Sequence, residues 1–373
     1  MTDLSLHIIS FDVPYPPDYG GVIDVFYKMK SLYNAGVRIF LHCFEYGRPQ
    51  STELNYYADK VYYYPRINSK SFLFNTDPYI VLSRNSAELK QNLLKDDYPI
   101  LMEGLHSTYL LRDHDLKNRF VMVRTHNVEH AYYDALARSE KNIFKRYYFY
   151  NEAGKLAKYE SVLKKAAAIA AISTADTAHF MHSYTGVHYI PAFHPYDKIK
   201  IQHGRGDFAL YHGNLSVGEN NEAALFLVEK VFNDMPNKLI IAGNRPSSQL
   251  RKTVNSSHNV VLHDNLSFHE IERLIGEAQC NILPTFQSTG IKLKLVASLF
   301  RGRTCIVNAP MVVNTGLETL CTIADSPEAM KNAVSQAMER NFNNEEIKKR
   351  EEILLRDFSN EKNAEKLIKI FSD

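Results

Sequence analysis

The sequence is poor in cysteine, in long apolar runs and in charge of one sign, and each shortage excludes a class of protein. The four cysteines stand far apart and form no C-x-x-C pair: Cys43, Cys280, Cys305 and Cys321. They therefore indicate neither a disulfide framework nor a zinc site. No stretch approaches the roughly 18 apolar residues of a membrane span. The N-terminus lacks the basic residues of a signal peptide, so we expect a cytoplasmic protein.

Charge is nearly balanced, with 44 lysines and arginines against 42 aspartates and glutamates and a formal net charge of +2. This balance excludes the bulk positive charge of a nucleic-acid binder. With 45% apolar and 23% charged residues, the composition is that of a globular chain and excludes collagen-like, low-complexity and disordered classes. At about 150 residues per domain, a chain of 373 residues is expected to form two domains.

Short apolar runs alternate with helical patterns in the first half of the chain. Val22–Ala35 has the 3.6-residue spacing of a helix and ends at Gly36, a good C-cap. A long basic and aromatic helix is predicted over Lys141–Lys165. The runs predicted as strands are Leu4–Ser10, Val37–Cys43, Lys60–Tyr64, Ile100–Glu103, Phe120–Thr125, Ala168–Ile172 and Val187–Ile190.

The pattern breaks at Pro191–Asp207, whose prolines, glycines and polar residues indicate a linker. A second alternating series follows, and the C-terminal tail has a helical pattern. The predicted strands of this half are Phe208–His212, Lys238–Ala242, Asn259–His263, Asn281–Pro284 and Thr304–Asn308, and its predicted helices are Asn221–Val231, His269–Ala278 and Lys292–Phe300.

This alternation in both halves predicts an α/β protein with two parallel sheets and right-handed crossovers. In open α/β sheets, ligands bind beyond the carboxyl ends of the strands. Two such domains joined by a short linker are expected to leave a cleft between those ends.

The segment Pro16-Pro17-Asp18-Tyr19-Gly20-Gly21 follows the first predicted strand and opens the first helix. Paired glycines let backbone N–H groups approach a ligand closely, and a helix N-terminus favours an anion. An ordinary tight turn is the alternative interpretation.

His126 follows the strand Phe120–Thr125, in the order Thr125-His126-Asn127-Val128-Glu129-His130. A histidine at the carboxyl end of a strand can hydrogen-bond a substrate hydroxyl or carry a proton, and the alternative is a structural histidine. His126 and His130 have the i, i+4 spacing of a metal pair. No third ligand is evident in the sequence, so we predict no metal site there.

Polar residues also gather at the first strand end of the second half. His212-Gly213-Asn214-Leu215-Ser216 ends the strand, and Asn220 and Asn221 stand where the next helix begins. Amides and free N–H groups in this place can hold phosphate or sugar hydroxyls. Helix capping by asparagine is the alternative.

The segment Ser288-Thr289-Gly290-Ile291-Lys292-Leu293-Lys294 follows the strand Asn281–Pro284 and opens another helix. Hydroxyls, a glycine and two lysines at one helix start favour a diphosphate cradle, because N–H groups and the helix dipole point at the anion. The P-loop pattern G-x-x-x-x-G-K-[ST] is absent. The alternative is a capped helix with solvated lysines.

The helix predicted over Lys141–Lys165 interleaves basic and aromatic side chains, as in Phe144-Lys145-Arg146-Tyr147-Tyr148-Phe149-Tyr150. This pattern suits an anionic membrane surface. A half-buried helix with a solvated charged face is the alternative.

Together these segments resemble a GT-B glycosyltransferase of family 4, also called glycosyl transferases group 1, which includes phosphatidylinositol mannosyltransferases. The likeness runs over nearly the whole chain. Gly21 corresponds to the second glycine of the family's first loop, near donor and acceptor, and His126 falls where the family carries its active-site histidine. The other segments that resemble the family, or one subgroup of it, are Arg124–Tyr133, Glu152–Glu160, Ile172-Ser173, Gly213-Asn214-Leu215, Ile240-Ile241-Ala242-Gly243 and Ser288–Gly302.

Four positions depart from the family's pattern. The family usually has two glutamates eight positions apart, and they correspond here to Thr289 and Ala297. The second glutamate normally accepts hydrogen bonds from the nucleotide's ribose, which alanine cannot do. The family's arginine and lysine at the start of the second domain correspond to Asn214 and Asn220. We expect the lysines at 292 and 294 to replace the lost positive charge at the diphosphate.

The resemblance implies the GT-B architecture of two Rossmann-like domains with an interdomain cleft. It implies an acceptor domain at 1–192, a linker at 193–204, a donor domain at 205–355 and a helix at 356–373 that packs back on the first domain. The implied reaction moves a sugar from a nucleotide-diphosphate sugar to a glycan or lipid-linked acceptor, as in polysaccharide biosynthesis. The family's rule is retention of the anomeric configuration, with no metal and no other cofactor.

The same resemblance assigns roles to individual residues. His126 is expected to be catalytic, and Tyr19, Gly20 and Asn127 to bind the acceptor. Contact with the inner face of a membrane is expected through 141–165, and no nucleic acid is expected as a partner. The donor-binding residues are expected to be Gly21, Asn214, Gly243, Ser288, Thr289, Gly290, Ile291, Lys292 and Lys294.

Two alternatives stay open. A sugar-nucleotide epimerase of the same fold would turn over a nucleotide sugar without any acceptor. A non-catalytic protein of this fold would bind a glycan or a partner protein, and Thr289 and Ala297 are compatible with it.

Overall fold

The computed structural model describes residues 3–286 and 292–372. Four predicted donor-site residues, Ser288, Thr289, Gly290 and Ile291, lie outside these ranges. The described chain divides into two compact units. The N-terminal unit comprises residues 3–195 and 358–372, and the C-terminal unit comprises residues 196–286 and 292–357.

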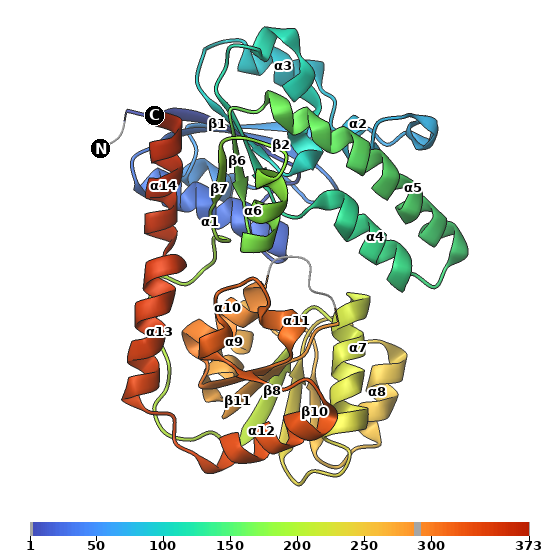
Figure 1. Cartoon of the computed structure of the whole chain (residues 1–373), viewed down its shortest axis with the longest axis vertical. Helices are drawn as coiled ribbons and strands as arrows, with labels where there is room; N and C mark the ends of the chain where they lie inside the picture. The colour runs from blue at the N-terminus through green and yellow to red at the C-terminus, as the bar shows by residue number, and fades with distance from the viewer. Residues whose placement is uncertain (1–2, 287–291, 373) are drawn as a thin grey trace. The chain divides into compact units, whose positions relative to one another are not determined.

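A parallel seven-stranded sheet forms the centre of the N-terminal unit, in the order β3-β2-β1-β4-β5-β6-β7 (Figure 1). In its register Ile8 of β1 lies opposite Leu41 of β2 and Leu101 of β4. The carboxyl ends of β1, β4 and β5 therefore meet at one edge of the sheet. The strands are β1 (Ser5–Ser10), β2 (Arg38–Glu45), β3 (Lys60–Pro65), β4 (Ile100–Glu103), β5 (Val121–Thr125), β6 (Ala168–Ala171) and β7 (Val187–Tyr189).

Helices cover both faces of this sheet, as the crossovers of a parallel sheet require. On one face the buried side chains of α1 and α14 share a core with β1 and β2, and Phe371 of α14 packs against Phe120. On the other face α5 contributes Leu156 to a second core, and α4 and α5 pack together as a helical hairpin (Figure 1). The α-helices are α1 (Gly20–Asn34), α2 (Tyr79–Leu82), α3 (Ala87–Leu93), α4 (Glu129–Ser139), α5 (Ile143–Tyr159), α6 (Thr174–Met181) and α14 (Asn360–Ser372), and short 3-10 helices lie at Thr52–Tyr56, Lys70–Phe74, Leu105–Arg112, His114–Leu116 and Glu160–Lys165.

The C-terminal unit has a six-stranded parallel sheet in the order β10-β9-β8-β11-β12-β13. Its strands are β8 (Phe208–His212), β9 (Lys238–Ala242), β10 (Val260–His263), β11 (Cys280–Leu283), β12 (Thr304–Val307) and β13 (Thr322–Ile323). Its helices are α7 (Gly218–Phe226), which continues as a π-helix at Leu227–Val231, then α8 (Ser248–Asn255), α9 (Phe268–Glu277), α10 (Leu293–Arg301), α11 (Ala309–Val312), α12 (Pro327–Glu339) and α13 (Asn344–Asp357), with a 3-10 helix at Glu318–Leu320.

These two parallel sheets confirm the predicted α/β class. The helix predicted over Lys141–Lys165 is in fact α5 followed by a 3-10 helix that begins at Glu160. The two-residue strand β13 is too short for the sequence pattern to show. In the part of the chain that the structure describes, none of the helices combines the length and the apolar character that a bilayer crossing requires.

Candidate active site

His126 lies directly after β5, at the edge of the sheet where β1 and β4 also end. Its side chain is buried, with 5% of the residue exposed. Its Nε2 lies 3.1 Å from Glu103 Oε2 at the end of β4 and 3.8 Å from Asp24 Oδ2 on α1. Three elements therefore fix the imidazole of His126 from one side.

A buried charge network holds those carboxylates. Lys28 Nζ donates to Asp24 Oδ2 at 2.7 Å and to Glu103 Oε2 at 2.9 Å. Arg124 of β5 donates to both oxygens of Asp24, at 3.0 and 3.2 Å, and also to the backbone carbonyls of Ile190 and Pro191. The network of Asp24, Lys28, Glu103 and Arg124 is fully buried.

Two cations and two carboxylates balance in this network, which is the condition for burying charges at tolerable cost. Burial alone would raise the pKa of Asp24, but the charges of Arg124 and Lys28 outweigh it and hold this pKa well below its usual range. Asp24 also accepts a hydrogen bond from Phe193 N at 2.8 Å, which ties α1 to the segment after β7. The network is thus a rigid base for His126.

Gly21 stands where the start of α1 meets the aromatic ring of Phe11. A Cβ at this position would lie 2.7 Å from Phe11 Cζ, so a side chain would displace the ring. The same ring lies 5.4 Å from His126, edge to face, and 5.4 Å from His106. Glycine at 21 therefore lets the start of α1 lie against the Phe11 ring, which in turn contacts the two histidines.

Tyr19 precedes this helix and is partly exposed. Its hydroxyl donates to Asp12 Oδ2 at 2.9 Å, and the Arg48 guanidinium lies over its ring at 5.4 Å. Arg48 also binds Asp18 and the carbonyl of Val13. Specific contacts thus hold the loop that ends at Tyr19, and the other predicted acceptor residue, Gly20, is the first residue of α1.

Unpartnered polar atoms concentrate at the ends of β4 and β5. Among the described residues, nine buried side-chain nitrogen or oxygen atoms have no hydrogen-bond partner. Such atoms are costly inside a protein and call for an explanation, which a polar ligand would provide. Six of the nine lie between residues 103 and 129: Glu103 Oε1, His106 Nδ1, Thr125 Oγ1, His126 Nδ1, Asn127 Oδ1 and Glu129 Oε1.

Glu129 and His106 face one another in this region, with 3.8 Å between Glu129 Oε1 and His106 Nδ1. Burial raises the pKa of Glu129 to about 8, against a smaller opposing effect of its hydrogen bond with Asn127. Burial and then the charge of Arg84 hold the pKa of His106 well below its usual value. Both side chains are therefore largely neutral at pH 7, and each can exchange hydrogen bonds with a hydroxyl.

In the C-terminal unit, β8 and β9 end in two glycines that touch. A Cβ on Gly243 would lie 2.0 Å from the carbonyl oxygen of Gly213, so only glycine fits there. The next residue, Asn214, accepts from Ser216 N at 3.1 Å and from Ser216 Oγ at 2.7 Å. Its carbonyl accepts from the Asn220 amide at 3.0 Å. Asn214 therefore shapes the turn before α7.

Lys294, in the first turn of α10, reaches this same turn. Its Nζ donates to Asn220 Oδ1 at 2.9 Å and lies 5.5 Å from the centre of the Tyr211 ring. Within the described ranges Lys294 forms no salt bridge. Burial lowers its pKa to about 8, although the nearby carboxylate of Glu219 opposes this shift. Glu219 itself accepts a hydrogen bond from Thr285 Oγ1.

Lys292 and Ala297 complete the described part of the predicted donor segment. Lys292 is the N-cap residue of α10, and burial lowers the pKa of its side chain. Ala297 is buried in the same helix. Beside it Ser298 Oγ lies 2.9 Å from His212 Nε2, and burial lowers the pKa of His212 to about 3, so this histidine is neutral.

Sequence reasoning did not identify Asp24, Lys28, Glu103, Arg124 or Glu129 as site residues. Asp24 and Lys28 are charged residues at core positions of an otherwise amphipathic helix, and Arg124 interrupts an apolar strand. Charged residues at these three apolar positions indicate a buried charge network. The sequence does not show that Arg124 pairs with Asp24, which lies 100 positions away. His126 and His130 turn to different partners, Glu103 and Glu160, and so form no pair.

Comparison with known proteins identifies the fold and the family of the second half of the chain. Residues 207–340 match the family described as glycosyl transferases group 1. The chain is 27% identical over 308 residues to an uncharacterized 44.6 kDa protein in the cps region of Klebsiella pneumoniae, covering 77% of this chain and 78% of that one. Sucrose-phosphate synthase from Thermosynechococcus elongatus superposes with a TM-score of 0.67 at 13% identity, covering 99% of this chain and 98% of that one.

A second solved structure is a mutant of TarM from S. aureus in complex with Fondaparinux, alpha-GlcNAc-glycerol and UDP. It superposes with a TM-score of 0.65 at 11% identity and covers 100% of both chains. The protein therefore has the GT-B fold of glycosyltransferases. More particularly, its residues 207–340 match the glycosyl transferases group 1 family, which confirms the family resemblance for this part of the chain.

Proposed function

We propose that this protein transfers a sugar from a nucleotide-diphosphate sugar to a glycan or lipid-linked acceptor. The observation that carries the proposal is the position of Lys294. This half-buried cation reaches Asn220, the position at which the family carries a lysine, and among the described residues no carboxylate forms a salt bridge with it. A cation without a paired carboxylate at a strand–helix turn is suited to bind an anion such as a diphosphate.

The contact of Lys294 with Asn220 suggests how the donor is bound. Departure of the nucleotide diphosphate leaves negative charge on the leaving group and oxocarbenium-like charge on the sugar. Lys294 and Lys292, together with the donor residues that the sequence predicts at 288–291, would stabilise that negative charge as it develops. The absence of a side chain at Gly243 lets the turn after β9 lie against the carbonyl of Gly213, which brings the two strand–helix turns together. UDP in the TarM complex supports a uridine or similar diphosphate as donor here.

On the acceptor side, we assign His126 to orientation of the reacting hydroxyl or donor sugar. Glu103 fixes Nε2, so Nδ1, which has no partner among the described residues, is the atom available to substrate. Glu129, Asn127 and Tyr19 supply further groups for sugar hydroxyls. The bond from the anomeric carbon to the phosphate oxygen breaks and a bond to the acceptor oxygen forms on the same face. The acceptor proton passes to the departing phosphate, with no metal and no protein nucleophile assigned.

The test is a transfer assay on two variants. His126→Ala and the Lys292→Ala/Lys294→Ala double variant should each lower kcat/KM by at least about 100-fold, as removal of a transition-state contact does. Circular dichroism and melting temperature should stay close to those of the wild type.

Matched controls are His114→Ala and the Lys230→Ala/Lys252→Ala double variant, which alter exposed residues of the N-terminal and C-terminal units. Both controls should keep full activity. Wild-type transfer by the Lys292/Lys294 variant would refute the diphosphate assignment.

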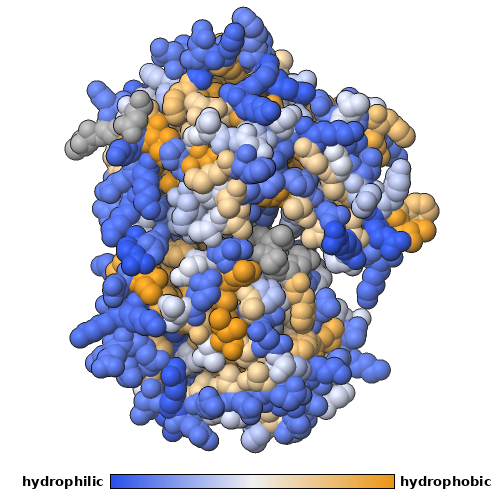
Figure 2. Space-filling view, in the orientation of Figure 1, coloured by the Kyte–Doolittle hydropathy of each residue, from blue (hydrophilic) through white to orange (hydrophobic). Residues whose placement is uncertain are grey.

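A lipid-linked acceptor is the finer form of the proposal, and the surface of α5 supports it. Ile143, Phe144, Tyr147 and Tyr150 are between 62% and 80% exposed, and Lys145 and Arg146 lie among them. Figure 2 shows apolar side chains at the tip of the α4–α5 hairpin, beside hydrophilic ones. Exposed aromatic and basic groups together favour an anionic membrane surface.

The 3-10 helix at Lys70–Phe74 adds to this surface. Lys155 of α5 donates to the carbonyl of Leu73 at 2.9 Å, and the next residue, Phe74, is 91% exposed. We predict that the protein co-sediments with vesicles containing anionic lipid and that binding falls as salt rises. Ile143→Ser/Phe144→Ser should abolish most of this binding, while Leu355→Ser, an exposed apolar residue of α13, should not. Absence of salt-sensitive binding would contradict the prediction.

A second candidate function is favoured by Ala297, which cannot accept a hydrogen bond from ribose. In that case the protein would be a non-catalytic GT-B protein that binds a glycan or a partner. It would bind neither UDP nor GDP, and the transfer assay would show no turnover with any nucleotide sugar.

A further inference from the structure

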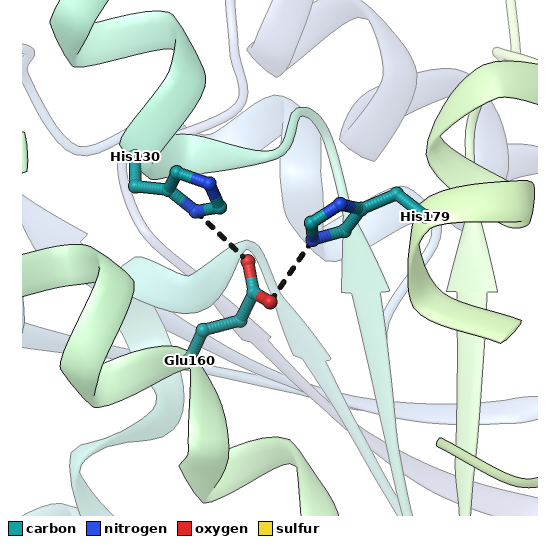
Figure 3. Close-up of side chains that lie close together, drawn as sticks. All are labelled: His130, Glu160 and His179. Atoms are coloured by element: carbon teal, nitrogen blue, oxygen red, sulfur yellow. Dashed lines mark hydrogen bonds and ion pairs between the residues drawn. The ribbon is translucent and has the colours of Figure 1, made fainter. Parts of the chain in front are cut away.

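A second cluster of titratable side chains lies outside the site already described. His130 in the first turn of α4, Glu160 at the start of the 3-10 helix after α5, and His179 on α6 converge on one point (Figure 3). His130 Nδ1 lies 3.1 Å from Glu160 Oε2, and His179 Nε2 lies 3.0 Å from Glu160 Oε1. Each residue offers one potential ligand atom, and these three atoms all lie within 4.8 Å of one another.

We propose that His130, Glu160 and His179 form a binding site for Zn²⁺ or a similar divalent transition-metal ion, with an open position for water. Two imidazole nitrogens and one carboxylate are a recurrent zinc ligand set. Around a tetrahedral ion with bonds of about 2.0–2.1 Å, neighbouring ligand atoms lie about 3.3 Å apart. The two nitrogen–oxygen separations, 3.1 Å to Oε2 and 3.0 Å to Oε1, are close to this value but involve different oxygens of Glu160. With one of these oxygens as the ligand, the three ligand atoms all lie within 4.8 Å of one another, so small side-chain rotations would bring them around one ion.

The electrostatics separate this cluster from the other set of potential ligands, Asp24, Glu103 and His126. There Lys28 and Arg124 already neutralise the two carboxylates. In the described part of the chain, no lysine or arginine forms a salt bridge with Glu160, whose ion-pair partners are the two histidines. The carboxylate of Glu160 is therefore open to a cation at its histidine side.

The surrounding structure holds the three side chains in place, as a metal site requires. Tyr184 donates its hydroxyl to the backbone carbonyl of Glu160 at 3.0 Å, and the ring of buried Phe180 packs edge to face on His179. Tyr159, next to Glu160, is buried in the core. His179 is partly exposed, with 37% of its side chain accessible, so an ion can enter from solvent.

A bound ion would link α4, the 3-10 helix after α5, and α6. None of the three residues has a role in the proposed transfer step. The metal-site proposal can therefore be tested independently of the proposed function. The sequence does not show this site as a motif, because Glu160 lies 30 positions after His130 and 19 positions before His179.

The test is calorimetric titration of untagged, chelator-treated protein with Zn²⁺, and visible absorption after titration with Co²⁺. The wild type should bind one ion per chain and give the absorption of tetrahedral cobalt. His130→Ala and His179→Ala should each weaken binding by at least about 10-fold. His182→Ala, an exposed histidine just after α6, should bind like the wild type.

The competing account is a purely structural hydrogen-bond bridge of the two histidines through Glu160. His179→Gln separates the two accounts, because glutamine can still donate to Glu160 but supplies no imidazole ligand. This variant should fold like the wild type and lose zinc affinity. A wild type that binds no ion saturably, or a His179→Gln variant with unchanged affinity, would overturn the proposal.

Discussion

At the scale of single residues, the candidate site contains ionisable groups whose pKa values are shifted by burial. Lys294 shows this most clearly, because burial lowers its pKa to about 8 and its hydrogen bond goes to the neutral amide of Asn220. A bound diphosphate would favour the charged form and raise this pKa again. Binding and protonation of Lys294 are therefore linked.

This linkage predicts a pH dependence. Since the pKa of Lys294 is about 8 in the free protein and higher in the complex, affinity for a nucleoside diphosphate should be full below pH 8 and fall as pH rises above it. Titration calorimetry between pH 7 and 9.5 measures the effect, expected to approach 10-fold per pH unit at most. Lys294→Arg, which stays charged throughout, should flatten the curve. An unchanged slope in this variant would contradict the assignment to Lys294.

The residue scale is also where the sequence said least. His126 was predicted from its place after a strand, and the structure puts it at a sheet edge with unpartnered polar atoms. Glu103 and Asp24, which hold His126, could not be assigned because a sequence does not show which distant side chains meet. Glu103 lies 23 positions and Asp24 lies 102 positions before His126 along the chain.

At the scale of elements, agreement was close where apolar runs end in turn residues. The strand predicted over Phe208–His212 is β8 itself, and the helix predicted over Val22–Ala35 is α1 with a start two residues earlier. Gly36 follows that helix with a positive φ of 91°, as a C-terminal glycine does. The pattern failed for the shortest elements, β13 with two residues and α2 with four, because about one period is too short to show a repeat.

The joining of α1, β4 and β5 through buried charges gives a prediction at this scale. Lys28→Met would leave Asp24 and Glu103 with Arg124 as their sole buried cation, at a cost of about 3–5 kcal/mol in unfolding free energy. Urea unfolding followed by circular dichroism measures this cost. Lys30→Met on the same helix, where the side chain is only half-buried, should cost less than about 1 kcal/mol. Equal losses in the two variants would contradict the role of the network.

At the scale of the whole molecule, the chain combines two parallel sheets, each with functional candidates at the carboxyl ends of its strands. In the N-terminal unit these are His126 and its neighbours, and in the C-terminal unit they are the turns at Gly213 and Gly243 with Lys294. Strand–helix alternation was enough to predict this architecture. It did not reveal the sugar or the base, because the alternation of elements carries no information about individual ligand contacts.

The most direct test of the central claim is calorimetric titration of the whole protein with UDP, GDP and their sugars. We predict that one nucleotide family binds with one site per chain, and that Lys292→Ala/Lys294→Ala weakens this binding by at least about 10-fold. His126→Ala should leave nucleotide affinity nearly unchanged, because its role is assigned to transfer. A wild-type protein that binds no member of the panel would contradict the account.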